Sequence, residues 1–378
     1  MTVLFVTNIP APYRIDFFTE LGKHCDLSVI FEAEKAPGTN NKIHDDWYAR
    51  NTNSNFKAVF LKKGEIQEKR FNLDIIQYLR SEYDVIILSN YSYYTELLAL
   101  VYLKARRTKY MLEVDGGILR QESGVRKYIK SFLIRGADVY ISPSVLTDEF
   151  LIHYGAEKEK ICRYYFSSFY EKDMLDSPPT IIQKSEIRGN LGIKEKRIIL
   201  SIGQFIHRKG YDVLLNACCR LSKDVGIYIL GGIPTDEYLE LQEKFGLSNV
   251  HFLDFLDKKS ISDYYRAADI FVLPTREDIW GLVISEAMAR GLPIITTSNC
   301  IAGIELVEEG VNGYIVPVED ANAISDKINI ILYNDELREK MCINSLKKIK
   351  PYTIENMARE HLAIFREAKN GGHNATNN

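Results

Sequence analysis

Short, uninterrupted apolar runs recur along this chain, and segments with helical spacing separate them. Such runs are typical of strands that are buried on both faces of a parallel sheet. They lie at residues 3–7, 27–31, 85–89, 110–114 and 139–142, and again at 197–202, 227–230, 250–253, 270–273, 294–297 and 314–316. Alternation of strand and helix, repeated in two halves, predicts an α/β fold of two doubly wound, Rossmann-like domains.

The length of 378 residues also fits two domains. Pro178 and Pro179, followed by a polar stretch, predict the boundary between them. We therefore expect an N-terminal domain over residues 1–180 and a C-terminal domain over residues 190–350. A helical pattern lies in segment 351–370, and we expect this helix to pack back on the N-terminal domain.

Composition narrows the class of function. The chain has 48 Lys and Arg against 51 Asp and Glu, and its net charge of −3 argues against general nucleic-acid binding. Its cysteines form no C-x-x-C pair, so we expect neither a zinc site nor a disulfide framework. The N-terminus lacks the basic start of a signal peptide, which predicts a cytoplasmic protein. We expect a polar surface excursion over residues 35–57 and a disordered tail over residues 370–378.

The stretch 273–293 carries the strongest local signal. A predicted strand ends in a loop with Glu277 and Asp278, and Gly281 then precedes a helix that bears Glu286. The first N–H groups of a helix have no partners within it, so together with the helix dipole they favour an anion such as phosphate. Carboxylates beside a phosphate suit sugar hydroxyls better than phosphate itself. An acidic helix cap and a solvated helix face are the alternative interpretation.

A second loop, residues 201–210, also joins a predicted strand to a helix. It matches neither the Walker pattern nor the dinucleotide fingerprint. Arg208 and Lys209 stand just before the helix, where two cations oppose the helix dipole unless an anion lies between them. This conflict favours a phosphate ligand, and two solvated surface cations are the alternative.

Together, these loops resemble those of the retaining glycosyltransferases of family four. That family has the GT-B fold, in which two Rossmann-like domains face each other across an interdomain cleft. The resemblance covers most of the chain and is most specific from residue 201 to residue 316. In the family, a Glu, seven intervening residues and a second Glu bind the donor. Glu286 matches the second Glu. Asp278, one methylene shorter, stands at the first by register, and the neighbouring Glu277 is the alternative.

The resemblance implies a role for each of these residues. Glu286 would hold the nucleotide ribose, Asp278 the hydroxyls of the transferred sugar, and Lys209 the diphosphate. The implied donor-binding set is Gly203, Arg208, Lys209, Trp280, Gly281, Leu282, Val283 and Glu286. Catalysis is assigned to Lys209, Asp278 and Asp115.

Asp115 is assigned from the N-terminal half of the chain. The stretch 113–117 follows a predicted strand and is similar to the family position that often carries a His near the transferred sugar. An Asp–Gly turn is the alternative. Where the family often has a Gly-rich loop, residues 8–14 are proline-rich, so we expect Tyr13 or Arg14 to face the cleft, unless this segment is only a helix-starting turn. The family generally needs no bound metal or other cofactor, so Glu113 is not taken as a metal ligand.

Residues 118–135 combine five basic side chains with interleaved apolar ones. Such a segment can lie on an anionic membrane surface, and a helix packed on its sheet is the alternative. The resemblance implies transfer of a sugar, with retention, from a nucleotide diphosphate sugar to a hydroxyl of a glycan or lipid-linked acceptor. UDP is taken as the nucleotide from its frequency in the family. Surface polysaccharide assembly at the inner face of the cell membrane is the family's common setting.

Two other functions stay open. A nucleotide-sugar 2-epimerase of similar architecture would need an acid and a base for proton abstraction and no acceptor. A non-catalytic partner subunit would bind the donor without turnover, which the shortened Asp278 allows.

Overall fold

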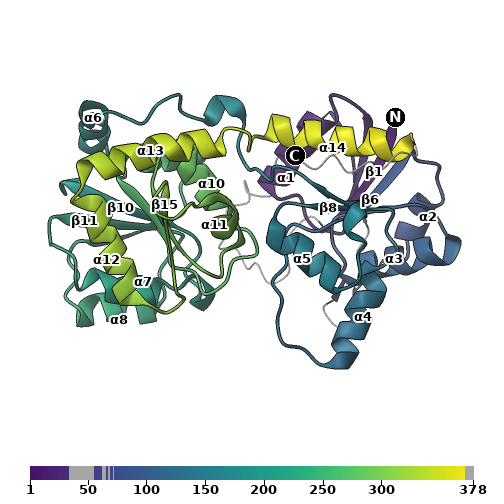
Figure 1. The fold of residues 1–378 in the computed structure, drawn as a ribbon, viewed down its shortest axis with the longest axis horizontal. Helices are drawn as coiled ribbons and strands as arrows, with labels where there is room; N and C mark the ends of the chain where they lie inside the picture. The colour runs from purple at the N-terminus through teal and green to yellow at the C-terminus, as the bar shows by residue number, and fades with distance from the viewer. Residues whose placement is uncertain (34–54, 62–64, 67–68, 71, 371–378) are drawn as a thin grey trace. The chain divides into compact units, whose positions relative to one another are not determined.

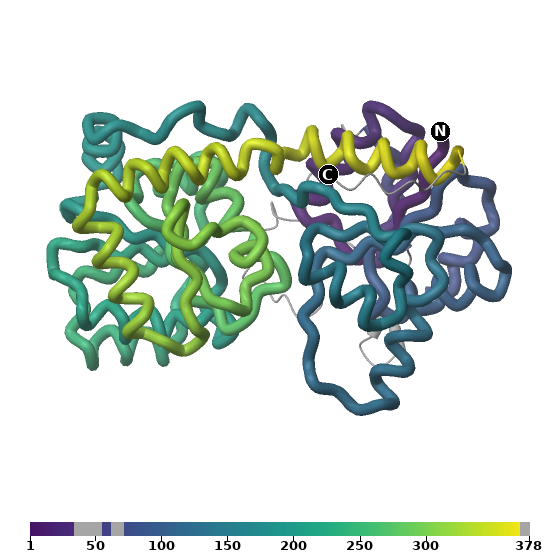
Figure 2. Tube along the Cα trace, in the orientation of Figure 1, coloured from purple at the N-terminus to yellow at the C-terminus, as the bar shows by residue number. Residues whose placement is uncertain are grey.

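The computed structural model describes residues 1–33, 55–61, 65–66, 69–70 and 72–370. Most of the expected excursion at 35–57, and the expected tail beyond residue 370, lie outside the described residues. The chain divides into two compact units (Figure 1). One comprises Met1–Ser168 together with the segment from Tyr352, and the other comprises Phe169–Pro351. Figure 2 follows the chain out of the second unit into its last helix, which belongs to the first unit.

The first unit contains a parallel sheet in the order β3-β2-β1-β6-β7-β8-β9. Its strands are β1 Thr2–Thr7, β2 Asp26–Phe31, β3 Lys57–Phe60, β6 Val85–Leu88, β7 Met111–Glu113, β8 Val139–Ser142 and β9 Ile161–Arg163. Short strands β4 Glu65–Ile66 and β5 Lys69–Arg70 form a separate antiparallel pair. Apart from Thr2, the central strands β1, β6 and β8 are buried, as their uninterrupted apolar sequences predict.

Helices of the first unit pack around this sheet. They are α1 Pro12–Leu21, α2 Ile75–Leu79, α3 Tyr94–Arg106, α4 Gly124–Ile134, α5 Val145–His153 and α14 Ile354–Lys369, with a 3₁₀ turn at Lys158–Lys160. The last helix, α14, packs against the first, α1 (Figure 1). Phe17 and His361 meet at this contact, with ring centroids 4.7 Å apart.

The second unit contains a parallel sheet in the order β12-β11-β10-β13-β14-β15. Its strands are β10 Arg197–Ile202, β11 Val225–Leu230, β12 Val250–Leu253, β13 Ile270–Leu273, β14 Ile294–Thr297 and β15 Gly313–Val316. Its helices are α6 Ile181–Leu191, α7 Tyr211–Cys218, α8 Asp236–Lys244, α9 Lys258–Ala267, α10 Leu282–Met288, α11 Ile301–Leu306, α12 Ala321–Leu332 and α13 Asp335–Ile349, with 3₁₀ turns at Glu171–Asp173 and His207–Lys209. The strand order reverses between β10 and β13, which makes their carboxyl ends the switch point of the sheet.

The prediction of two doubly wound α/β domains is confirmed. The sequence did not reveal β3 and β9, because both lie at the edges of the sheet and carry partly exposed side chains instead of an apolar run. The division between the units falls upstream of Pro178, since the following segment packs with the second unit. There, Leu175 N donates to Ala289 O at 2.9 Å. Along the described part of the chain, no helix is long and apolar enough to cross a membrane.

Candidate functional site

The two loops singled out in the sequence meet at the switch point of the second sheet. One follows β10 and the other follows β13, and hydrogen bonds join them. Arg276 N donates to Arg208 O at 2.8 Å, and the Arg208 guanidinium donates to Glu277 O at 2.7 Å. Thr275 Oγ1 also donates to Arg208 O at 2.9 Å. Ligands of open α/β sheets bind at this kind of position.

Lys209, Arg208 and Asp278 lie together in these loops. Lys209 Nζ is 2.6 Å from Asp278 Oδ2, and Arg208 Nη1 is 3.4 Å from Asp278 Oδ1. The side chains of Lys209 and Asp278 are each only 12% exposed, whereas that of Arg208 is 44% exposed. Two cations therefore face one carboxylate, and the cluster keeps a net positive charge that suits an anionic ligand.

Two glycines of these loops lie so close to neighbouring atoms that a side chain would not fit. Gly210 has a φ of +69°, and a Cβ there would collide with the carbonyl oxygen of Pro274. Gly281 has a φ of +101°, and a Cβ there would lie 2.8 Å from Cys300 Sγ. Both positions therefore require glycine, for backbone conformation and for space.

The predicted helix after Gly281 is α10, which ends at Met288. Trp280 is buried, and its carbonyl oxygen accepts from Ala302 N at 2.9 Å, so this carbonyl is held within the fold. Leu282 and Val283 begin the helix and are partly exposed. Gly203 directly follows β10, and its carbonyl oxygen accepts from the Tyr211 hydroxyl at 2.9 Å.

Glu286 lies on α10 and is half-buried. The Tyr265 hydroxyl, on α9, donates to Glu286 Oε2 at 3.1 Å and thereby orients the carboxylate. Burial raises the pKa of Tyr265 well above its usual value, with Glu286 adding to the effect, so this tyrosine stays a donor. The sequence analysis missed Tyr265, because a buried Tyr in a helix carries no motif.

Arg276 is a second residue that the sequence analysis missed. Its guanidinium binds both carboxylate oxygens of Asp212, at 2.8 and 2.6 Å, and also the Glu319 carboxylate. It donates in addition to His207 O at 2.6 Å. Arg276 therefore ties the loop after β13 to the loop after β10 and to the start of α7.

In the first unit, Asp115 follows β7 and lies in a buried group of charges. Arg14 Nη2 is 2.6 Å from Asp115 Oδ1, and Arg14 Nη1 is 2.6 Å from Glu113 Oε1. Of the two residues expected to face a cleft, Arg14 does not, because its side chain is 2% exposed, whereas Tyr13 is partly exposed. Pro12 begins α1, so the proline-rich segment is a helix-starting turn, and the helix directs Arg14 inward.

Burial and neighbouring charges act differently on the two carboxyls. Burial raises the pKa of Glu113, but Arg14 and His361 outweigh it and bring this pKa to about 2. Burial raises the pKa of Asp115 to about 6, because it outweighs the lowering effect of Arg14 and repulsion from Glu113 adds to it. Asp115 is thus the carboxyl of this group that titrates near neutral pH.

The segment 118–135 contains α4, whose Ile134 is buried in the core of the first unit while most of its other apolar side chains are exposed. Four of them recur at helical spacing on one side and are between 51% and 74% exposed: Val125, Tyr128, Ile129 and Phe132. The basic residues Arg126 and Lys127 lie beside this stripe and are exposed.

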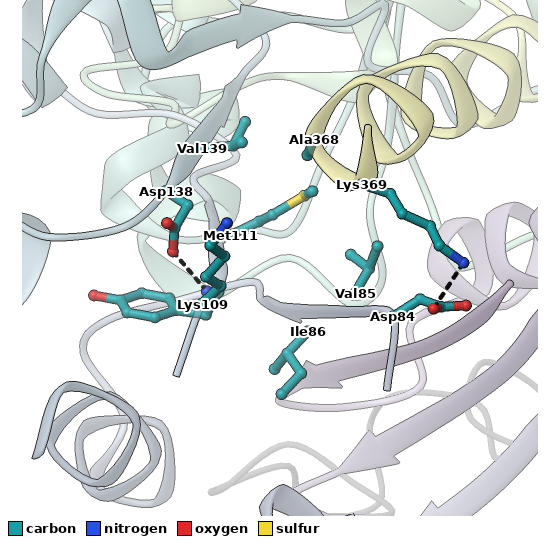
Figure 3. Close-up of a pocket in the computed structure, with 10 residues that line it drawn as sticks. Asp84, Val85, Ile86, Lys109, Met111, Asp138, Val139, Ala368 and Lys369 are labelled. Atoms are coloured by element: carbon teal, nitrogen blue, oxygen red, sulfur yellow. Dashed lines mark hydrogen bonds and ion pairs between the residues drawn. The ribbon is translucent and has the colours of Figure 1, made fainter. Parts of the chain in front are cut away.

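Outside the predicted site, metal-binding groups and cavities are the other places where a ligand could bind. Within the described ranges, no group of His, Cys, Asp and Glu could hold a metal ion. A cavity of about 200 Å³ lies at the amino ends of β6, β7 and β8, where Lys369 Nζ is 2.8 Å from Asp84 Oδ1 (Figure 3). This is the edge of the first sheet opposite to the carboxyl ends, so the cavity is separate from the predicted site.

Comparison with known proteins shows which family the second unit resembles. Residues 183–348 match the family model of glycosyl transferases group 1. An uncharacterized 41.2 kDa protein from the cps region of Klebsiella pneumoniae is 30% identical over 213 residues, which cover 55% of this chain and 57% of the relative. The D-inositol 3-phosphate glycosyltransferase of Corynebacterium diphtheriae is 24% identical over 66% of this chain and 60% of its own length. The chain thus matches less than two thirds of the length of either relative.

Solved structures extend the likeness to nearly the whole chain. The sucrose-phosphate synthase of Thermosynechococcus elongatus superposes with a TM-score of 0.75 at 16% identity, covering 98% of this chain and all of its own. Anabaena Alr3699/HepE, solved with UDP and glucose, gives a TM-score of 0.74 at 19% identity, covering 96% of this chain and 99% of its own. Residues 183–348 are therefore similar to the glycosyl transferases group 1, and the two units of the chain have the GT-B fold.

Proposed function

We propose that this chain is a retaining glycosyltransferase that moves a sugar from a nucleotide diphosphate sugar to a hydroxyl of a glycan or lipid-linked acceptor. The observation that carries the proposal is the cluster of Lys209, Arg208 and Asp278 at the switch point of the group 1 domain. Lys209 and Arg208 are the groups for the diphosphate, and Asp278 is the group for the sugar hydroxyls. Glu286, held by Tyr265, is the group for the ribose.

In the proposed reaction, the acceptor oxygen bonds to the anomeric carbon on the face from which the leaving diphosphate departs. The bond between that carbon and the phosphate oxygen breaks, and the leaving phosphate takes the proton of the acceptor hydroxyl. Negative charge grows on the phosphate in an oxocarbenium-like transition state. Lys209 and Arg208 would stabilise this charge, so we expect the reaction to be independent of added metal.

Nucleotide binding is the first test. Thermal unfolding is measured with UDP-, GDP-, ADP- and dTDP-sugars and with the free nucleotides, in the presence and absence of EDTA. UDP is the first candidate, since Anabaena Alr3699/HepE was solved with it. One nucleotide should stabilise the protein in both conditions, and Lys209→Ala and Glu286→Ala should abolish the effect. Lys340→Ala, an exposed lysine of the same unit, is the control. If no nucleotide stabilises the protein, the donor site is refuted.

Turnover then separates the three functions considered. A glycosyltransferase forms a glycosylated acceptor and releases nucleoside diphosphate faster when that acceptor is present. A 2-epimerase converts the donor without any acceptor. A non-catalytic subunit binds the donor and converts nothing.

We also propose that α4 touches an anionic membrane surface, at the inner face of the cell membrane. The exposed apolar stripe would enter the lipid interface, and Arg126 and Lys127 would meet anionic headgroups. Replacing Tyr128 and Phe132 by Ser should abolish cosedimentation with vesicles that contain anionic lipid. The matched control replaces Ile181 and Ile182, which are similarly exposed on α6, by Ser. Equal binding by both double variants would refute this contact.

A further inference from the structure

A series of ionisable side chains in contact with one another runs from α14 to the end of β7 in the first unit. His361 Nε2 is 3.4 Å from Glu113 Oε2, and Glu113 Oε1 is 2.6 Å from Arg14 Nη1. Arg14 Nη2 then contacts both oxygens of Asp115, at 2.6 and 2.7 Å. The side chains of His361, Glu113 and Arg14 are 0%, 0% and 2% exposed, whereas that of Asp115 is 28% exposed. The series therefore ends at one partly accessible carboxylate, that of Asp115.

The sequence builds this arrangement from an i, i+2 pair. The backbone stays paired through Val114, whose N–H donates to Ile141 O at 3.0 Å. In an extended backbone, side chains two residues apart point to the same face, so Glu113 and Asp115 both meet Arg14. The two carboxylates of the E-x-D pattern thus bind the same arginine, Arg14.

Gly116 and Gly117 follow Asp115. A Cβ at Gly117 would overlap the Phe150 ring, so packing against α5 explains that glycine. The side chains that orient the Asp115 carboxylate are Arg14, which contacts both of its oxygens, and Tyr164, whose hydroxyl donates to Asp115 Oδ1 at 3.3 Å.

Arg14 is suited to this task and is itself firmly held. Its guanidinium lies 5.8 Å from the ring centroid of Phe5, 5.7 Å from that of Tyr13 and 6.0 Å from that of Phe166. The planar guanidinium directs one nitrogen to each carboxylate, whereas a lysine would offer a single ammonium on a flexible stem. Removing a buried charge from its partners is strongly unfavourable, which keeps the group together.

We propose that Arg14 is a positioning residue that fixes the Asp115 carboxylate for contact with a hydroxyl of the transferred sugar or the acceptor, and that Glu113 and His361 hold Arg14 in place. The inference rests on the proposed function, in which Asp115 contacts the sugar. Arg14 Nη2 contacts both carboxylate oxygens and the Tyr164 hydroxyl donates to Oδ1, while the remaining lone pairs of the partly exposed carboxylate can accept hydrogen bonds from hydroxyl groups. The ligand of this position is therefore a neutral, hydroxylated group.

A double-mutant cycle tests the inference through turnover. Arg14→Lys keeps the positive charge but loses the planar guanidinium that binds both carboxylates. This variant should lower kcat by about ten- to a hundredfold, while nucleotide binding in the second unit stays unchanged. Asp115→Asn should lower kcat as well. If Arg14 acts through Asp115, Arg14→Lys should cause little further loss in the Asp115→Asn background. An equal loss in both backgrounds would overturn the inference. Arg163→Lys, 44% exposed in the same unit, is the control.

A crystal structure of the Arg14→Lys variant tests the same inference without turnover. The Asp115 carboxylate should leave the position that it has in the unmodified protein, and an unchanged position would overturn the inference. Where Arg14→Lys does not fold, Glu113→Gln takes its place, with a smaller displacement and a smaller loss expected. If the unmodified protein transfers no sugar, the proposed function fails, and the crystal structures still decide whether Arg14 positions Asp115.

Discussion

Lys209 Nζ lies 2.6 Å from Asp278 Oδ2 in the second unit, and both side chains are largely buried. In the proposed reaction, these two groups serve different parts of the donor, the diphosphate and the sugar. Their ion pair therefore has to loosen, at least in part, when Lys209 binds phosphate. Asp278 thus has two opposed effects, since it competes with the phosphate for Lys209 and it holds the sugar.

Asp278→Asn should separate these two effects. Without the carboxylate, Lys209 is free to bind phosphate, so the variant should bind free UDP at least as tightly as the unmodified protein. Transfer should fall by about a hundredfold, because a charged contact to the sugar is lost in the transition state. Calorimetric titration with UDP and a turnover assay measure the two quantities. Glu277→Gln, at the neighbouring position, is the control, and weaker UDP binding in Asp278→Asn would contradict this account.

Gly210 should tolerate no side chain, and Gly192 provides a matched comparison. The two have φ values of +69° and +70°, but only Gly210 has a backbone carbonyl, that of Pro274, where a Cβ would stand. Gly192→Ala should cost about 1 kcal/mol for the backbone conformation alone. Gly210→Ala should cost at least about 2 kcal/mol more and weaken nucleotide binding, because the loop has to shift. Thermal unfolding with and without UDP tests this, and equal costs would refute the collision.

Tyr265→Phe should weaken donor binding without unfolding the chain. The variant loses the hydrogen bond of 3.1 Å to Glu286 Oε2 and keeps the buried ring. A hydrogen bond to a charged group contributes about 1.5–3 kcal/mol, so we expect an increase of roughly tenfold or more in the Kd of the nucleotide. Tyr264→Phe, one residue earlier on α9, should leave the Kd unchanged. An unchanged Kd in Tyr265→Phe would show that Glu286 needs no such support.

The sequence could predict the fold because the central strands carry long apolar runs. It also located both loops of the second unit, since Arg208, Lys209 and Asp278 stand at strand–helix junctions that the sheet topology brings together. The edge strands β3 and β9 were missed, because their side chains are partly exposed and give no such run.

The residues that hold the site were not predictable in the same way. Arg276 and Tyr265 contact partners that are distant in sequence, and no local pattern records such contacts. Arg14 was misjudged for a similar reason. Its carboxylate partners Glu113 and Asp115 lie at the end of β7, and His361 on α14 contacts Glu113. Only the packed fold shows that the two carboxylates neutralise a buried arginine.

Protonation of Asp115 should slow the transfer reaction at acidic pH, which appears as an acidic limb in the pH profile. Its pKa of about 6 means that the carboxylate becomes protonated as the pH falls through this value, and a protonated carboxyl accepts hydrogen bonds from sugar hydroxyls less well. We therefore expect kcat/KM to fall below about pH 6, with an apparent pKa that belongs to the coupled pair of Asp115 and Glu113. The limb should be absent from the pH profile of Asp115→Asn. A limb that persists in this variant would assign the titration to another group.

Stability should change with pH in the opposite direction over the same range. Since the pKa of Asp115 is raised on folding from 3.8 to about 6, the folded chain binds more protons between these values, and the free energy of unfolding falls as the pH rises through them. Glu113 has a pKa lowered from 4.5 to about 2, so its stabilising contribution is present above 4.5 and is lost as the pH falls towards 2. In Asp115→Asn, the free energy of unfolding should no longer fall as the pH rises from 4 to 6. The loss of stability towards pH 2, which belongs to Glu113, should remain. Thermal unfolding of the variant and the unmodified protein across this range tests both signs, because a parallel pH dependence of the two proteins would contradict the assignment to Asp115.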